Sequence, residues 1–356
     1  MSTFITALLA FAATCFFIYL YKPLAIKGGL VDIPDQRKHH SGHIPLIGGL
    51  SIYSAYLGIS LITGDLSSSH LTFLGCAFVM IVLGAIDDYK DLSFKLRLAV
   101  QAIIALIMVY AADVKIDTLG NLFDSGEVEL GKIAPFFTVI AVIGCINAFN
   151  MMDGIDGLCS GVTIVTLLTV ALYNANTQPL TINIAAIILC LLAYIIFNLQ
   201  LISKRIPKVF MGDAGSMFIG FLVMWLLAET TQTGLTTPPV MAIWMIAIPL
   251  MDMGAIMIRR LRKGESPFQP DRNHLHHILM RAGFSAREAL VMILILASLT
   301  SLLGYTLLQA GISEWNLMLV WLVLFGFYSA GINHAWGLSK IIKNGDTRKN
   351  PHSNNH

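Results

Sequence analysis

A segment near the middle of the chain, INAFNMMDGIDG at 146–157, places polar side chains directly after an apolar run. Asn147, Asn150, Asp153 and Asp156 follow one another at intervals of three residues. Residues three apart lie on the same side of a helix, so continued helix would align all four side chains on one face. Gly154 and Gly157, each directly after one of the two acids, would allow a tight turn or the close approach of a ligand.

A second acidic pair, Asp87 and Asp88, follows another apolar run. Two adjacent carboxylates repel each other, and a divalent cation or a nearby basic side chain would relieve that repulsion. If the next helix begins near Ser93, then Lys95 and Arg97 lie in its first turn, where the helix dipole disfavours cations. We therefore expect these two cations to serve an anion outside their own helix.

A third acid lies in VFMGDAGSMF, where Gly212 and Gly215 flank Asp213 immediately before an apolar run. The free N–H groups of a helix N-terminus form an anion site. A carboxylate among them can hold Mg²⁺ near a bound phosphate. Oxygen ligands of this kind suit Mg²⁺ or Mn²⁺ rather than zinc.

The elements that carry these residues are strongly apolar. Of 356 residues, 56% are hydrophobic and 12% are charged, and the mean hydropathy is +0.73. Soluble proteins carry about 25% charged residues, so the composition indicates an integral membrane protein. A membrane-spanning helix needs ~20 mostly apolar residues, and the sequence predicts an all-α polytopic membrane protein with about eleven such segments. They lie near 3–21, 44–63, 71–86, 97–112, 133–149, 159–173, 180–198, 214–229, 239–258, 288–309 and 315–336.

The cations fall almost entirely on one set of loops, because only Lys115 and Lys132 lie on the other set. The positive-inside rule then predicts a periplasmic N-terminus and a cytoplasmic C-terminus. We expect one membrane domain over 1–340 and a disordered cytoplasmic tail over 341–356. The five cysteines lie in or beside apolar runs and imply no disulfide framework.

The three acidic segments described above, and Asp271 in the large loop after the ninth run, all fall on the predicted cytoplasmic side. Oxygen ligands, cations and glycine turns at helix ends together indicate phosphoryl transfer, which needs charge neutralisation and positioning. A membrane location suggests a lipid substrate. An ion-coupled transporter is the competing class, but it predicts charges near the bilayer midplane. No pattern indicates a nucleic-acid partner.

Several motifs in this order resemble those of the polyprenyl-phosphate N-acetylhexosamine-1-phosphate transferases. This family includes the muramyl-pentapeptide translocase of peptidoglycan synthesis and the eukaryotic dolichyl-phosphate enzyme. The resemblance covers nearly the whole chain and is closest to the bacterial GlcNAc branch. The motifs are RKHHSGHIPLIGGLSIY, GAIDDYKDLSFKLR, INAFNMMDGIDGL, KVFMGDAGS, WMIAIPLMDM and RRLRKGESPFQPDRNHLHHILMRAGF.

The resemblance implies transfer of GlcNAc-1-phosphate from UDP-GlcNAc to undecaprenyl phosphate, with Mg²⁺ or Mn²⁺, on the cytoplasmic face of a bacterial inner membrane. The same chemistry with another UDP-N-acetylhexosamine stays open, as does assembly into a homo-oligomer. The implied pathway step is the first membrane step of O-antigen or enterobacterial common antigen synthesis.

The resemblance also assigns roles to single positions. It implies metal ligation by two residues, catalysis by four acids and substrate binding by the cations, an asparagine and the histidines of the HLHH segment. These are, in that order, Asn150 and Asp213; Asp87, Asp88, Asp153 and Asp156; and Lys95, Arg97, Asn147, Arg260, His274, His276 and His277.

One further acid, Asp252, lies inside the ninth apolar run. An ionisable residue within a membrane segment is a functional candidate, but Asp252 could also pair with Arg259 or a neighbouring helix. We leave both interpretations open here. For the histidines of HLHH, hydrogen bonding to sugar or phosphate is favoured over zinc, since no cysteine lies nearby.

Overall fold

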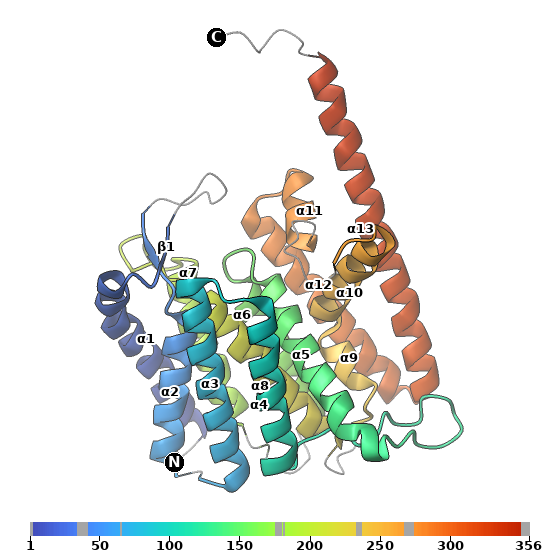
Figure 1. Ribbon diagram of the computed structural model, residues 1–356, viewed down its shortest axis with the longest axis horizontal. Helices are drawn as coiled ribbons and strands as arrows, with labels where there is room; N and C mark the ends of the chain where they lie inside the picture. Colours follow the sequence, from blue (N-terminus) through green and yellow to red (C-terminus); the bar gives the residue numbers. More distant parts are fainter. Residues whose placement is uncertain are drawn as a thin grey trace.

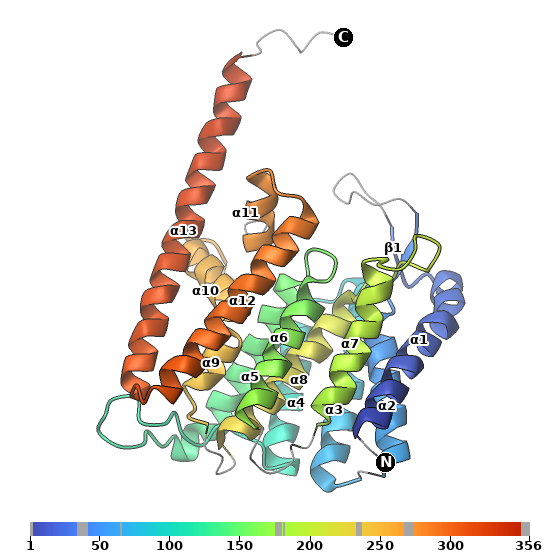
Figure 2. The same ribbon diagram turned by 180° about the vertical axis from the view of Figure 1, so that it is seen from behind.

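The computed structural model describes residues 3–33, 42–64, 66–174, 180, 182–232, 237–266 and 274–349. The described chain is a bundle of helices, viewed from opposite sides in Figures 1 and 2. The helices are α1 (Thr3–Gly28), α2 (Gly48–Thr63), α3 (Ser68–Lys90), α4 (Phe94–Ala111), α5 (Ala134–Met152), α6 (Leu158–Tyr173), α7 (Ile184–Asn198), α8 (Gly212–Gln232), α9 (Met241–Met245), α10 (Ala247–Arg262), α11 (Leu275–Arg281), α12 (Ala286–Gln309) and α13 (Glu314–Lys349).

Every predicted apolar run contains a helix, and within the described residues seven helices are long and apolar enough to cross a membrane. Helices α2, α6 and α7 are shorter apolar helices. Large apolar side chains such as Phe4, Phe136 and Phe327 are 70% or more exposed, at 72%, 70% and 74%. Because soluble proteins rarely expose large apolar patches, these surfaces indicate contact with lipid. The protein is thus an all-α, multi-pass membrane protein.

Helix α8 lies at the centre of the bundle, and its most apolar stretch is entirely buried. Its neighbours approach closely because glycines replace larger side chains. A Cβ on Gly84 of α3 would overlap the backbone of Ala214 in α8, and a Cβ on Gly220 of α8 would overlap Ile146 in α5. Small residues allow such close backbone contact between membrane helices. The starts and ends of α3, α5 and α8 are therefore fixed relative to one another.

The ninth apolar run is two helices instead of the single one expected for 239–258. Helix α9 ends at Met245 and α10 begins at Ala247, with Ile246 between them. Pro249 explains the break, because it has no N–H to donate to the carbonyl four residues earlier. That carbonyl, of Met245, accepts from the hydroxyl of Thr166 in α6 at 3.1 Å. Membrane helices tolerate such breaks where a neighbour satisfies the freed group.

A short segment of strand fixes the start of α2. Strands β1 (Val31–Asp32) and β2 (Ile44–Pro45) pair antiparallel. The backbone N–H groups of Gly48 and Gly49 then donate to the carbonyls of Phe210 and Met211, at 2.9 and 3.2 Å. The start of α2 is thereby tied to the segment that leads into α8.

Helix α13 continues to Lys349, and residues 350–356 lie outside the described residues. The domain boundary at 340 and the disordered tail therefore stay predictions. The cysteines are free, as expected: Cys76, Cys145, Cys159 and Cys190 are buried, and Cys15 is partly buried.

Candidate functional site

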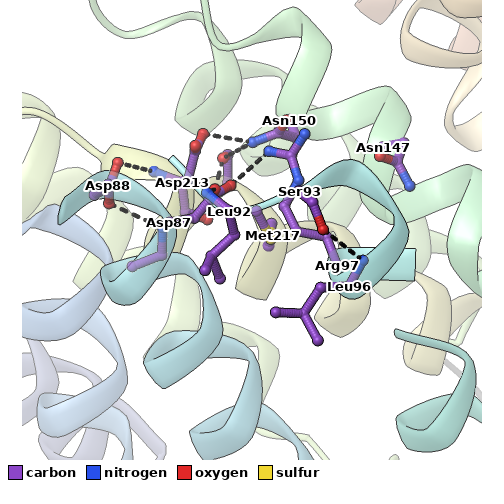
Figure 3. Close-up of polar contacts among 12 residues, drawn as sticks. Asp87, Asp88, Leu92, Ser93, Leu96, Arg97, Asn147, Asn150, Asp213 and Met217 are labelled. Atoms are coloured by element: carbon purple, nitrogen blue, oxygen red, sulfur yellow. Dashed lines mark hydrogen bonds and ion pairs between the residues drawn. The ribbon is translucent and has the colours of Figure 1, made fainter. Parts of the chain in front are cut away.

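The acids expected to converge do so at the adjoining ends of α3, α5 and α8 (Figure 3). Asp88 accepts hydrogen bonds from the backbone N–H groups of Asp213 at 2.9 Å and of Ala214 at 3.3 Å. The Nδ2 of Asn150 donates to Asp213 Oδ1 at 2.8 Å and to Ser216 Oγ at 2.9 Å. Three segments distant in sequence thus form one polar centre.

The start of α8 was expected to bind an anion, and in this structure the anion is the carboxylate of Asp88. Asp88 supplies the N-terminal cap of α8 from a different helix. Gly212 fits beneath it, because a Cβ at this position would meet Asp88 Oδ2, and its φ of 71° also favours glycine. The cap fixes α3 against α8 at the level of the site.

Asp87 is buried at the end of α3, and its carboxylate is fully engaged. It accepts from the backbone N–H of Leu92 at 2.7 Å and forms an ion pair with Arg97. Arg97 lies in the first turn of α4, which begins just after Ser93, so the expectation that this cation serves an external anion is confirmed. Lys95 in the same turn has an exposed side chain and makes no hydrogen bond or ion pair with the described part of the chain.

The four polar residues of 146–157 do not share one helix face. Helix α5 ends at Met152, and Asp153 is its C-terminal cap residue. Gly157 has a φ of 78° and is the N-terminal cap residue of α6, so the chain turns between Asp153 and Gly157. Burial, and then the charges of Asp213, Asp88 and Asp156, raise the pKa of Asp153 to about 8. The turn therefore presents a carboxyl to a region already rich in negative charge.

Asp156 lies at the other end of this turn and has a cation of its own. Lys208 Nζ lies 2.6 Å from Asp156 Oδ2. Asn198 Nδ2 donates to Asp156 Oδ1 at 3.4 Å and to the carbonyl of Val209 at 2.9 Å. The turn is thereby attached to the segment that enters α8.

Asn147 lies one helical turn deeper and points toward α4 rather than the carboxylates (Figure 3). Its Nδ2 donates to Gln101 Oε1 at 3.0 Å and to the carbonyl of Ile143 at 2.8 Å. A role for Asn147 in substrate binding stays a prediction.

The histidine segment contacts the same turn at Gly154. His276 is buried, and its ring occupies the space that a Cβ on Gly154 would need. Its neighbour His277 lies 4.1 Å away between ring centroids. Burial, reinforced by His277 and His274, lowers the pKa of His276 to about 3, so this imidazole is neutral at physiological pH. A neutral ring can donate one hydrogen bond and accept another.

Arg260 is buried in the last turn of α10, where its Nη1 donates to the carbonyl of Ser266 at 2.9 Å. This contact holds the beginning of the large loop against α10. Asp271, further along that loop, lies outside the described residues.

The donor chemistry of the centre fits a hard divalent cation. Asp213 accepts one hydrogen bond from Asn150 through Oδ1, and the same Asn150 side chain carries an amide oxygen that is a second potential ligand. The negative charge of Asp87 acts on Asp213, and the raised pKa of Asp153 reflects the same crowding of carboxyls. Within the described residues, no three His, Cys, Asp or Glu side chains form a group that could hold a metal alone. Mg²⁺ is commonly bound by one or two carboxylates together with substrate phosphates and water.

Several residues of the site were not predicted from the sequence: Gln101, Asn198, Lys208 and Ser216. Lys208 and Ser216 flank Asp213 by five and three residues, so their position near the acid was a signal. Asn198 ends an apolar helix and resembles an ordinary helix terminus in the sequence.

Comparison with known proteins agrees with this geometry. The model of glycosyl transferase family 4 matches residues 70–231, which include the acids of α3, the 153–157 turn and Asp213. Relatives named undecaprenyl-phosphate alpha-N-acetylglucosaminyl 1-phosphate transferase occur in several bacteria. The Salmonella typhi protein is 45% identical over 342 residues, which are 94% of this chain and 92% of the relative.

The Escherichia coli strain K12 protein is 44% identical over 341 residues, which are 94% of this chain and 92% of the relative. The Haemophilus influenzae protein is 39% identical, covering 96% of each. The chain therefore belongs to glycosyl transferase family 4, in the group that contains these sugar-1-phosphate transferases.

Proposed function

We propose that this protein transfers GlcNAc-1-phosphate from UDP-GlcNAc to undecaprenyl phosphate and releases UMP. The observation that carries the proposal is the meeting of Asp88, Asn150 and Asp213 in one polar centre at the end of apolar helices. Its oxygen donors suit a diphosphate with a divalent cation, and the lipid-facing helices suit a polyprenyl acceptor. The relatives' names mention undecaprenyl phosphate and the N-acetylglucosaminyl 1-phosphate group, which supports this acceptor and this transferred group.

We propose Mg²⁺ or Mn²⁺ as the cofactor, with Asp213 and Asn150 as its ligands from the protein. When bound, the ion neutralises phosphate charge on the diphosphate. Asp87 holds the Arg97 guanidinium at the edge of the centre, where it can contact a phosphate oxygen. Lys95 and Arg260 are further cations for the phosphates.

The acceptor needs little activation. The second pKa of a phosphate monoester is near ~6, so undecaprenyl phosphate is largely a dianion at neutral pH. We propose direct attack of an oxygen of this dianion on the β-phosphorus of UDP-GlcNAc. The new P–O bond forms as the bond from the β-phosphorus to the bridging oxygen breaks, and UMP leaves with that oxygen.

The side chains then have positioning and electrostatic tasks. Asp88 fixes the start of α8, and Asp87 orients Arg97. Asp153 and Asp156 lie at the two ends of the turn that faces the nucleotide. Hydrogen bonds to the sugar and its phosphates come from His274, His276 and His277. The alternative route, through an aspartyl phosphate on one of the acids, contains two displacements. A donor chiral at the β-phosphorus separates the two, because direct attack inverts the configuration and two displacements retain it.

We propose that the site faces the cytoplasm of an inner membrane, with eleven spans and a periplasmic N-terminus. The support is the distribution of Lys and Arg, of which only Lys115 and Lys132 lie on the opposite loops. The product would then enter O-antigen or enterobacterial common antigen synthesis as its first lipid-linked sugar.

The test is turnover by the purified protein in detergent with undecaprenyl phosphate and a panel of UDP-sugars. We expect release of UMP and formation of undecaprenyl-diphospho-GlcNAc, with UDP-GlcNAc as the best donor. Faster turnover with another UDP-N-acetylhexosamine would change the substrate. No release of UMP with any donor, from a folded protein, would refute the proposal.

A further inference from the structure

Asp252 is a buried carboxylate on α10, and three hydrogen bonds converge on it. His274 Nδ1 lies 2.7 Å from Oδ2, and the backbone N–H of Leu275 donates to Oδ1 at 3.0 Å. The hydroxyl of Tyr328, on α13, donates to Oδ1 at 2.9 Å. One side chain thus connects three separate elements: α10, the start of α11 and α13.

This arrangement determines the state of His274. An ionised carboxylate only accepts hydrogen bonds, so the proton of the His274–Asp252 contact belongs to Nδ1. The ring of His274 is thereby held in one tautomer and one orientation, with Nε2 as an acceptor in the neutral form. Second partners of this kind fix how a histidine presents its other nitrogen.

The anchored segment reaches the turn that carries Asp153. The ring of His276 lies parallel to that of His274, with 5.8 Å between centroids and 2° between planes. His276 Nε2 is buried without a hydrogen-bond partner in the described structure, and it occupies the space beside Gly154. A continuous set of contacts therefore leads from Asp252 to the turn between α5 and α6.

We propose that Asp252 is a positioning residue for the sugar-nucleotide half of the reaction. It fixes the start of α11, sets the tautomer of His274 and seats His276 on the Gly154 turn. This inference rests on the proposed function, and it specifies which substrate Asp252 serves. Asp87 and Asp88 make none of these contacts, since they bind the start of α8 and Arg97 instead.

A double-mutant cycle tests the inference against a purely structural role. Asp252→Asn keeps the size of the side chain but removes its charge and one acceptor, and His274→Gln removes the imidazole. Misplacement of a binding group by about an ångström costs up to ~100-fold, so we expect kcat/KM for UDP-GlcNAc to fall about tenfold or more in each variant. The KM for undecaprenyl phosphate should stay within about twofold. The kcat/KM of the double variant should be no lower than that of the less active single variant, because both changes break the same connection.

Tyr328→Phe is the matched control, since it removes one hydrogen bond to the same carboxylate and leaves His274 in place. We expect its kcat/KM to stay within about threefold of wild type, a loss that fits one hydrogen bond of modest net strength. Multiplying losses in the double variant, an equal rise in both KM values, or unchanged kinetics in Asp252→Asn would overturn the inference. Failure of the proposed function is a separate outcome, because the wild-type protein would then release no UMP.

Discussion

At the scale of single residues, the carboxylates of the centre differ in how fully they are satisfied. Asp87 has an arginine and a backbone N–H, and Asp88 has two backbone N–H groups. Asp213 has one amide donor, and Asp153 accepts no hydrogen bond from the described residues. Both residues are only partly buried, so Asp213 and Asp153 are the carboxyls with capacity left for a ligand.

Replacement of Asp213 should therefore remove activity without unfolding the protein. Asp213→Asn keeps the shape of the side chain but lowers the charge available to the cation and diphosphate. Loss of such an electrostatic contact costs about 100-fold or more in kcat, measured as UMP release. Asp113→Asn is the matched control, because Asp113 is exposed on the loop after α4 and its φ of 54° suits asparagine. Full activity in Asp213→Asn would contradict the metal role.

The pH dependence of stability should reveal Asp153. Its pKa is raised to about 8 in the folded protein, whereas an unfolded aspartate has a pKa near ~3.9. Between these values the folded state binds a proton that the unfolded state has lost, so this group lowers stability as pH rises. Asp153→Asn cannot lose a proton. In EDTA, the thermal midpoint of the variant relative to wild type should thus increase from pH 5 to pH 8.5. A constant difference across this range would show that Asp153 is ionised throughout.

The sequence predicted the reactive residue types better than their partners. Asp87, Asp88, Asn150 and Asp213 could be identified because several polar segments beside apolar runs fall on one predicted side of the membrane. The pairing of Asp156 with Lys208 depends on how α7 and the segment before α8 pack, and spacing carries no information about that packing.

At the scale of elements, the site depends on how closely α3 and α8 approach. Gly84 makes this contact possible, because a Cβ would overlap the backbone of Ala214. We expect Gly84→Ala to lower the free energy of unfolding by about 1–3 kcal/mol. Activity should fall too, since Asp88 would be displaced from the start of α8.

Gly75→Ala, in the same helix, is the control for Gly84→Ala. A Cβ on Gly75 meets no atom within 4 Å, so alanine should stabilise the helix by about 0.5–1 kcal/mol. Thermal midpoints in detergent, together with UMP release, compare the two variants. Equal effects would show that the contact between α3 and α8 is not tight.

Helix ends were harder to predict than the apolar runs themselves. The asparagines and aspartates of 147–156 have helical spacing, yet α5 ends at Met152. The break in the ninth run had a signal in Pro249, but its stability depends on Thr166 of α6. Local pattern identifies a possible break, and tertiary packing decides whether it forms.

At the scale of the whole molecule, composition and the length of the apolar runs predicted an all-α membrane protein, and the helices confirm it. The contacts place the ends of α3, α5 and α7 and the starts of α4, α6 and α8 at one end of the bundle. Only three-dimensional packing could show that α8 lies at the centre, because its sequence is less apolar than that of its neighbours.

The proposed orientation can be measured by labelling. In a background without the native cysteines, Ser125→Cys lies on the loop before α5 and Ser203→Cys lies on the loop after α7. A membrane-impermeant maleimide should label the first in cells with a permeabilised outer membrane and the second only after lysis. The reverse pattern would place the site in the periplasm.

The most direct measurement is Mn²⁺ binding by electron paramagnetic resonance on the purified protein, with and without UDP-GlcNAc. We predict about one bound Mn²⁺ per chain in the presence of the nucleotide sugar, because one or two side-chain ligands leave coordination positions for phosphate oxygens. Asp213→Asn should lose this bound ion, and Asp113→Asn should keep it. Undiminished turnover of the wild-type protein in excess chelator, without bound Mn²⁺, would show that the converging carboxylates do not serve a metal–diphosphate complex.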